Sequence, residues 1–354
     1  MKIFFFHYGF WIDNLFIENF IHISVEDFRK FLLKELTVQL RDHGFVFTEP
    51  DMDGIASFDL AAKRDDDKFI IKIVYNIDTI REENAIEMNY ISKLIGCIAL
   101  VIGKRASNGD LESNIVYYRH EIPIMTYDTF IDYMDGSRPY IYSAHGGYYV
   151  SIKGDSLRSL REKKRYSIGY VSGSIGVSRR SISLYETGTA ATLDVYMKLQ
   201  RLFSDDIKKT IDLLSGIRTT QANRFPENLQ NDFFESIFSM MRSLGFEMFP
   251  FRKTPFDAMA SDNAADRIML GLAEQLGSYR KAKAIANLSK LFEKDSLVVS
   301  KEKTDKSSIQ GCPVVNYSDM VEANRNGSLD MLLRKKGRIL LQGKGTKPPQ
   351  QGRL

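Results

Sequence analysis

Cysteine is scarce in this 354-residue chain, which holds only Cys97 and Cys312. The two lie far apart in the sequence without a nearby Cys or His partner. The usual spacing of a zinc finger and a disulfide framework are therefore both excluded. Cys97 stands in an apolar run and is expected in the core. This cysteine usage fits the reducing cytoplasm, where we expect the protein to be located.

Histidine is also scarce, and no His-x-x-x-His or Glu-x-x-His pair indicates a bound metal. A glycine-rich phosphate loop is missing too, because Gly146-Gly147 lacks the Lys-Ser/Thr pair that a P-loop requires. The sequence therefore predicts no metal site and no cofactor.

Long apolar runs are confined to the N-terminus, where residues 1–24 are rich in Phe, Ile and Leu. A membrane-spanning helix needs roughly 20 mostly apolar residues, and a signal peptide needs a small-residue cleavage site. Asp13 and Glu18 interrupt this run. We interpret residues 1–24 as an N-terminal extension of a cytoplasmic protein and expect no contact with a membrane. A signal anchor is the alternative.

Neither sign of charge is in excess, since 49 basic and 45 acidic residues give a formal net charge of +4. A nucleic-acid partner must therefore be argued from local charge and not from the total. With 44% hydrophobic and 27% charged residues the composition is that of a globular protein. Because 354 residues exceed what one core holds, we expect two or three domains.

Residues 25–150 carry alternating helix and strand signals. A helix is indicated by apolar residues four apart, namely Phe28, Leu32, Leu36 and Leu40. A second helix covers residues 83–94. Strand-like runs cover residues 57–62, 69–75, 98–102 and 115–118. Such alternation favours an α/β domain, and Gly146-Gly147 indicates a turn or hinge leading out of it.

Residues 225–323 repeat the signals of the first block in the same order. The matching segments are 44–45 and 245–246, 58–61 and 256–259, 91–94 and 288–291, 99–102 and 296–299, and 122–124 and 312–314. Several matches in one order are hard to obtain by chance, so we expect a second α/β domain related to the first. Residues 324–354 are basic and rich in Gly, Lys, Pro and Gln, which predicts a flexible tail.

Residues 151–216, between these blocks, show short helical segments and no strand run. Leu157 and Leu160 mark the apolar face of a first helix. Ser167 can cap a second helix and Ser178 a third, which covers residues 179–186. Gly176 between them suits the tight turn of two crossing helices. A fourth helix, over residues 193–203, closes the group.

The run from Ser167 to Gly188 resembles the Cro/repressor (XRE-type) helix-turn-helix (HTH). Gly-Val-Ser at 176–178, Ile-Ser at 182–183 and Tyr-Glu-x-Gly at 185–188 fall at that family's spacing. The wider order of segments resembles an archaeal family of HTH-type transcriptional regulators. The resemblance implies a mixed α/β and all-α fold, in which a central HTH domain of four to five helices lies between two related α/β domains.

In the Cro/repressor family the third helix enters the major groove and presents its first residues to base edges. Carried over by position, Arg179, Arg180 and Leu184 would face the bases. Phosphate contacts would come from serines, namely Ser167, Ser178, Ser181 and Ser183. Arg161 and Glu186 match positions of a structural ion pair. Ser172, where the family has Ala, and Gly173 depart from the pattern and weaken the second helix by roughly 1 kcal/mol.

The first block also resembles the restriction-endonuclease-like core, in which an Asp, an acidic residue and a Lys two positions later hold a metal. Asp59 and Lys72 match this pattern, but Ile70 stands in place of the second carboxylate. The third block keeps Asp257, with Ile268 and Leu270 at the corresponding places. We expect two degenerate copies without a catalytic residue. A site completed by an acidic neighbour is the alternative, the candidates being Glu83, Glu87 and Asp66.

These patterns together predict a transcriptional regulator that binds double-stranded DNA in a sequence-specific manner, as a homodimer. The α/β domains would dimerise or sense an effector, either a small molecule or a protein. Two alternatives remain: a metal-dependent nuclease that the HTH targets to DNA, and an antitoxin-like module that binds another protein.

Overall fold

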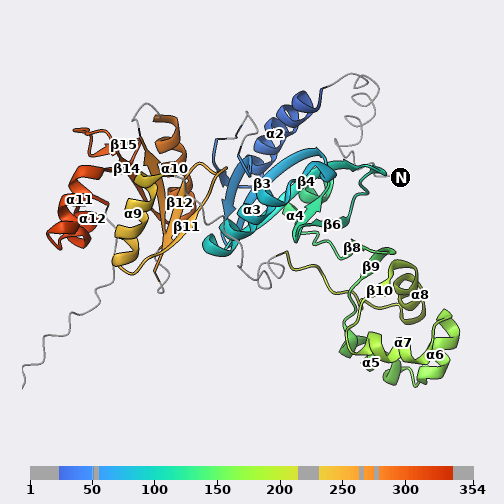
Figure 1. The fold of residues 1–354 in the computed structure, drawn as a ribbon. Helices are drawn as coiled ribbons and strands as arrows, with labels where there is room; N and C mark the ends of the chain where they lie inside the picture. The colour runs from blue at the N-terminus through green and yellow to red at the C-terminus, as the bar shows by residue number, and fades with distance from the viewer. Residues whose placement is uncertain are drawn as a thin grey trace, which may run out of the picture.

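The computed structural model describes residues 24–49, 51, 56–213, 231–262, 267–274 and 279–337 (Figure 1). The predicted N-terminal extension, apart from Ser24, lies outside the described residues, as do residues 338–354. Within the described part of the chain, no helix is long and apolar enough to cross a membrane.

The first α/β unit follows the periodicity of the sequence. Its helices are α2 (Val25–Asp42), η1 (Ile77–Thr79), α3 (Glu82–Ile95) and α4 (Tyr127–Met134). Its strands are β1 (Val46–Phe47), β2 (Leu60–Arg64), β3 (Asp67–Asn76), β4 (Ile98–Ala106), β5 (Gly109–Asp110), β6 (Ile115–Arg119) and β7 (Ile122–Met125). The predicted strand at 57–62 begins later, at Leu60, because Ser57 and Asp59 make contacts outside the ladder.

The second α/β unit has the same plan. Its helices are α9 (Asp232–Ser243), α10 (Tyr279–Phe292), α11 (Tyr317–Arg325) and α12 (Leu329–Gly337). Its strands are β11 (Glu247–Pro250), β12 (Ala258–Ser261), β13 (Arg267–Ala273), β14 (Asp295–Ser300), β15 (Ser308–Ile309) and β16 (Cys312–Asn316).

Both sheets have one strand order and one pattern of directions. The order β1-β2-β3-β4-β7-β6 in the first unit corresponds to β11-β12-β13-β14-β16-β15 in the second. In each order, the central strand, β4 or β14, pairs in parallel with both of its neighbours. The other strand pairs in the two orders are antiparallel. Agreement in both order and direction makes the two units structural copies of each other.

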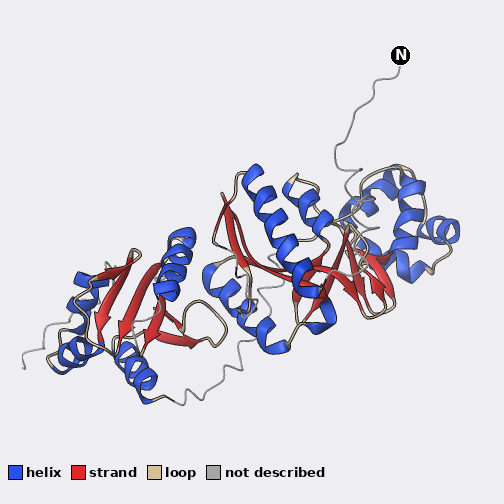
Figure 2. Ribbon diagram, turned by 90° about the horizontal axis from the view of Figure 1, so that it is seen from above, coloured by secondary structure: helices blue, strands red, loops and turns tan. Residues whose placement is uncertain are grey.

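The two units share one buried apolar cluster. In the first unit, α2 and α4 cover one face of the sheet and α3 covers the other; in the second, α9, α11 and α12 cover one face and α10 the other. Both α3 and α10 contribute to this common core, α3 through Met88 and Ile91 and α10 through Ile285 and Leu288. The copies therefore pack against each other within the chain, and Figure 2 shows them side by side.

Polar contacts of the backbone reinforce this packing. The Ser57 backbone nitrogen donates to the carbonyl oxygen of Lys253 at 2.6 Å. The Glu87 carboxylate on α3 accepts from the backbone nitrogens of Arg252 at 2.7 Å and Lys253 at 3.2 Å. Burial raises the pKa of Glu87, and these two donors oppose that rise. The segment around Lys253 is thus held directly against α3.

A small helical unit follows the first sheet. It contains α5 (Gly154–Lys163), α6 (Ile168–Ile175), α7 (Arg179–Glu186) and α8 (Leu193–Phe203), packed around Leu157, Val171, Ile182 and Leu199. The sheet of the first unit continues into it through β8 (Ile141–Ala144), β9 (Gly147–Val150) and β10 (Ala191–Thr192). Because the two-residue β10 lies within residues 151–216, the expected absence of strands from that range is wrong. The segment after α8 runs back beside the segment that leads from β9 into α5. The Lys209 backbone nitrogen there donates to the Ser151 carbonyl oxygen at 2.8 Å.

One expectation about the chain's connections is confirmed and one is wrong. Gly146 and Gly147, expected as a turn or hinge before the helical block, have positive φ angles of 93° and 132° and form the turn of the β8–β9 hairpin. Residues 324–337, expected in a flexible tail, complete α11 and form α12, where Leu329 and Leu333 are buried in the second unit. The apolar residues of this short segment outweigh its basic character.

We predict that α12 contributes to the stability of the second unit. Leu333→Ala removes a side chain that is 0% exposed, so it should lower the free energy of unfolding by about 2–5 kcal/mol. Met331→Ala on the same helix is the control, because Met331 is 68% exposed and should change that energy by no more than about 0.5 kcal/mol. Urea denaturation measures both, and equal effects would contradict the packing of α12.

Candidate nucleic-acid interface and nuclease-like core

Two capped helices that meet at a glycine form the candidate interface. The Ser167 hydroxyl accepts from the Tyr170 backbone nitrogen and caps α6. Gly176 ends α6 with a φ of 75°, a left-handed conformation that glycine adopts without strain. The Ser178 hydroxyl then accepts from the Ser181 backbone nitrogen and starts α7 only two residues later. The caps and the glycine therefore fix the sharp change of direction between the helices.

The outer face of α7 carries the residues predicted to contact DNA. Arg179, Arg180, Ser183 and Leu184 are exposed, whereas Ile182 is fully buried on the inner face. Among the described residues, neither guanidinium has a hydrogen-bond or ion-pair partner. An exposed helix face with free guanidinium groups and an apolar side chain has the chemistry of a base-reading surface.

The four predicted phosphate-contact serines serve the helices as well. Ser167 and Ser178 are exposed caps, and the half-buried Ser181 lies with its Oγ 2.9 Å from the Ser178 Oγ. The Ser183 hydroxyl donates to the Arg179 carbonyl oxygen at 3.3 Å. Three of the four lie on or next to α7, and Ser167 lies at the start of α6.

Positive charge is concentrated in this helical unit. Residues 154–204 contain nine basic and four acidic residues, which is an excess of five positive charges. The whole chain has a formal net charge of only +4. The local excess is the electrostatic pattern expected of a surface that approaches phosphates.

Arg161 and Glu186 form a two-pronged ion pair that joins α5 to the end of α7. The Arg161 Nε lies 2.5 Å from the Glu186 Oε1, and its Nη2 lies 3.1 Å from Oε2. The Arg161 side chain is 12% exposed and that of Glu186 is 8% exposed. The hydrogen bond that Arg161 donates to Glu186 raises the pKa of the arginine. The geometry fits the structural role that the sequence assigned to this pair.

We predict that Glu186→Ala destabilises the helical unit, because it removes the carboxylate that both Nε and Nη2 of the largely buried Arg161 guanidinium contact. The expected loss in the free energy of unfolding is about 1–3 kcal/mol. Lys198→Ala breaks a solvent-exposed i,i+4 pair with Asp194 and should cost no more than about 0.5 kcal/mol. Thermal unfolding followed by circular dichroism separates the two; an unchanged Glu186→Ala midpoint would refute the structural role.

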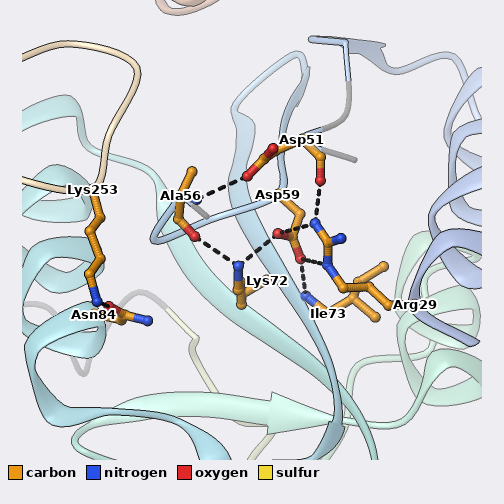
Figure 3. A network of polar contacts seen from close by, with 8 residues as sticks. All are labelled: Arg29, Asp51, Ala56, Asp59, Lys72, Ile73, Asn84 and Lys253. Carbon is orange, nitrogen blue, oxygen red and sulfur yellow. Dashed lines mark hydrogen bonds and ion pairs between the residues drawn. The ribbon is translucent and has the colours of Figure 1, made fainter. Parts of the chain in front are cut away.

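Asp59 lies just before β2, at the centre of a polar cluster below the sheet (Figure 3). Its Oδ1 is 2.8 Å from both the Arg29 Nη2 and the Lys72 Nζ. Its Oδ2 accepts from the Ile73 backbone nitrogen at 2.8 Å. The Asp59 side chain is 0% exposed. Two cations of the chain therefore satisfy and neutralise this buried carboxylate.

The cluster does not fit a divalent metal ion. A hard cation needs several oxygen ligands, and clustered carboxylates are the usual donors. Here Ile70 stands where a second carboxylate would be and is buried in the apolar cluster between the copies. Arg29, which sequence reasoning missed, donates to the Asp51 carbonyl oxygen as well as to Asp59. A positive charge therefore already lies on each side of the Asp59 carboxylate, while the Asp51 carboxylate accepts from the Ala56 backbone nitrogen at 2.9 Å.

The second copy has a similar but simpler arrangement. The Asp257 Oδ2 accepts from the Leu272 backbone nitrogen at 2.6 Å, as Asp59 does from Ile73. The Asp257 Oδ1 pairs with Lys281 of α10 at 2.6 Å. The buried fraction is lower here, because the Asp257 side chain is 17% exposed.

The register of the second copy corrects the expected correspondence. The Asp59 backbone nitrogen donates to the Ile71 carbonyl oxygen, and the Asp257 backbone nitrogen donates to that of Leu270, so Ile71 and Leu270 are equivalent. The equivalents of Ile70 and Lys72 are therefore Met269 and Gly271. Ile268 and Leu270, expected there, lie one residue away and on the other face of the sheet. A side chain at Gly271 would clash with Ile285, since its Cβ would lie 2.6 Å from the Ile285 Cδ1. The lysine of this copy therefore comes from α10.

The acidic residues that could complete a catalytic site lie elsewhere. Glu87 is used in the contact with Arg252 and Lys253, and Glu83 and Asp66 are exposed. Across the described ranges, no group of three or more His, Cys, Asp or Glu side chains could hold a metal ion. Cys97 is buried as expected, and burial raises its pKa to about 12, so it is not a reactive thiol.

We predict that Asp59 stabilises the fold through charge balance. Asp59→Ala removes the buried carboxylate that pairs with both Arg29 and Lys72, whose side chains are each 12% exposed, and should cost about 3–5 kcal/mol of unfolding free energy. Asp257→Ala is the matched control in the second copy and should cost less, because that pair is more exposed. Chemical denaturation compares them, and a midpoint of the wild-type protein that rises with added Mg²⁺ would contradict the assignment.

The fold and this cluster define a mixed α/β protein with a nuclease-like core, and residues 29–139 match a family described as a PD-(D/E)XK superfamily domain. The match begins at Arg29 and includes Asp59 and Lys72. No solved structure matches the chain.

Close relatives cover most of the chain. A Picrophilus torridus protein is 40% identical over 298 residues, which are 83% of this chain and 93% of its own. A Thermoplasma acidophilum protein is 35% identical over 320 residues, 89% of this chain and 100% of its own. A Methanocaldococcus jannaschii protein is 33% identical over 298 residues, which are 82% of this chain and 92% of its own. All three are named "Putative HTH-type transcriptional regulatory protein". The chain belongs to this archaeal family of HTH-type transcriptional regulatory proteins.

Proposed function

We propose that the chain is a transcriptional regulator that reads double-stranded DNA with a Cro/repressor-type HTH formed by α6 and α7. The observation that carries the proposal is the outer face of α7, where Arg179, Arg180 and Leu184 are exposed and the two guanidinium groups have no partner within the described residues. The names of the relatives and the local excess of positive charge support it.

The same proposal assigns roles to the other predicted residues. Arginine suits guanine, whose two major-groove acceptors match the guanidinium fork, at about 1–3 kcal/mol per good pair. The capping serines at 167 and 178 and the serines at 181 and 183 would contact the DNA backbone. The organisation that follows is a first α/β domain at 25–150, an HTH domain at 151–216 and a second α/β domain, now extended to residue 337.

A dimer is part of the proposal, because one recognition helix supplies too few base contacts for strong selection. Each chain carries one α7 within its described residues, and its two α/β units are already paired with each other. Two chains would therefore place two recognition helices on a palindromic site. No observation identifies an effector.

The PD-(D/E)XK match makes a DNA-cleaving enzyme the second candidate. We propose that the chain does not cleave DNA, because Asp59 is neutralised by Arg29 and Lys72 and both copies have an apolar residue in place of the second carboxylate. Metal-assisted cleavage needs a bound cation to polarise water and to stabilise the leaving group. The nuclease-like units would then serve as scaffold for the HTH.

The test is selection of bound duplexes from a random DNA library, with and without Mg²⁺. We expect a palindromic motif from the wild-type protein, lost when Arg179 and Arg180 are both changed to Ala. The control removes two positive charges from the second α/β unit, with exposed Lys303 and Arg325 both changed to Ala, and should keep the motif. This control separates base reading from the general loss of charge.

Each other result has a defined meaning. No enriched motif from the wild-type protein would refute sequence-specific binding. Loss of the duplex in the presence of Mg²⁺ would favour the nuclease. An equal loss of the motif in the control would show that only general charge is read, and binding of a partner protein without any DNA motif would favour the antitoxin-like alternative.

A further inference from the structure

Arg179 lies with its guanidinium against the backbone of Gly169. A Cβ atom built on Gly169 would lie 3.1 Å from the Arg179 Nη2, 3.2 Å from its Nε and 3.4 Å from its Cζ. The two nitrogens are nearer than the Cζ, so the guanidinium edge that carries Nε and Nη2 faces the position where any other residue has its side chain. Gly169 belongs to the first turn of α6, and Arg179 is the first residue of α7.

A second glycine in α6 shows that this contact is specific. Gly173 lies four residues later, and a Cβ atom there would meet nothing within 4 Å. Both glycines have ordinary helical φ angles and both weaken the helix relative to alanine. Of these two glycines, only Gly169 has another side chain, that of Arg179, in the space that its own side chain would take.

We propose that Gly169 is a positioning residue for DNA reading, which holds the Arg179 guanidinium against α6 and thereby sets the base preference that Arg179 imposes. The inference rests on the proposed DNA-binding function. An arginine side chain has many rotamers, and restricting them before binding reduces the entropy lost when the complex forms. No atom of Arg180 is among the three nearest to a Cβ atom built on Gly169.

The experiment compares Gly169→Gln, Arg179→Ala and the double variant, with Gly173→Gln as the matched control. Glutamine is uncharged and a good helix former, so both glutamine variants keep the net charge and strengthen α6 equally. In the full chain, Gly169→Gln should lower the affinity for the selected duplex by about 2- to 12-fold, the effect of immobilising one flexible side chain. Gly173→Gln should leave that affinity unchanged.

Two further readouts distinguish positioning from a structural role. The base position whose preference changes in Gly169→Gln should be the one that changes in Arg179→Ala, and not the one that changes in Arg180→Ala. In the Arg179→Ala background, Gly169→Gln should cause no additional loss, since it acts through Arg179. Thermal unfolding of each variant verifies that the helical unit is folded.

The outcomes separate this inference from the proposed function. Additive losses in the double variant, or a similar loss in Gly173→Gln, overturn the role of Gly169 while wild-type binding stands. A wild-type protein that selects no duplex overturns the proposed function, and the inference with it.

Discussion

Burial of one apolar cluster shared by the two α/β units is the constraint on which the rest of the structure depends. Each unit has helices on both faces of its sheet, and α3 of the first and α10 of the second both contribute side chains to this cluster. Each copy therefore buries one of its apolar faces against the other copy in the same chain. This packing also draws the segment around Lys253 against α3, where Glu87 accepts its backbone hydrogen bonds.

The polar cluster around Asp59 follows from the burial of its carboxylate. A carboxylate that is 0% exposed must be compensated, and a metal-binding site would compensate it with a cation from solution. Here Arg29 and Lys72 supply the positive charge from α2 and β3. In the second copy α10 supplies Lys281 instead, because Gly271 is packed too closely for a side chain. Both copies thus keep the aspartate and pair it with basic side chains, each in its own way.

Much of this architecture could be predicted from local signals. The four-residue spacing from Phe28 to Leu40 gave α2, and the serines at 167 and 178 are the caps of α6 and α7. Contacts between distant segments could not be predicted in this way. Arg29 and Asp59 are thirty residues apart, and no pattern near either one indicates the other. The one-residue error at Ile268 and Leu270 arose because the Asp257 backbone nitrogen donates to a residue thirteen positions later, Leu270, whereas that of Asp59 donates to one twelve positions later, Ile71.

The helical unit is attached to the first sheet by two segments and not by a single linker. The entry segment runs through β8 and β9, and the segment after α8 returns beside it, with Ile211 donating to Pro139 at 2.8 Å. This double connection fixes the direction of α7 relative to the first α/β unit. Since the α3 and α10 faces are already buried within the chain, they are not available to join two chains. The proposed dimer on a palindromic site would therefore have to use another surface, and that surface would set the spacing of the two α7 helices.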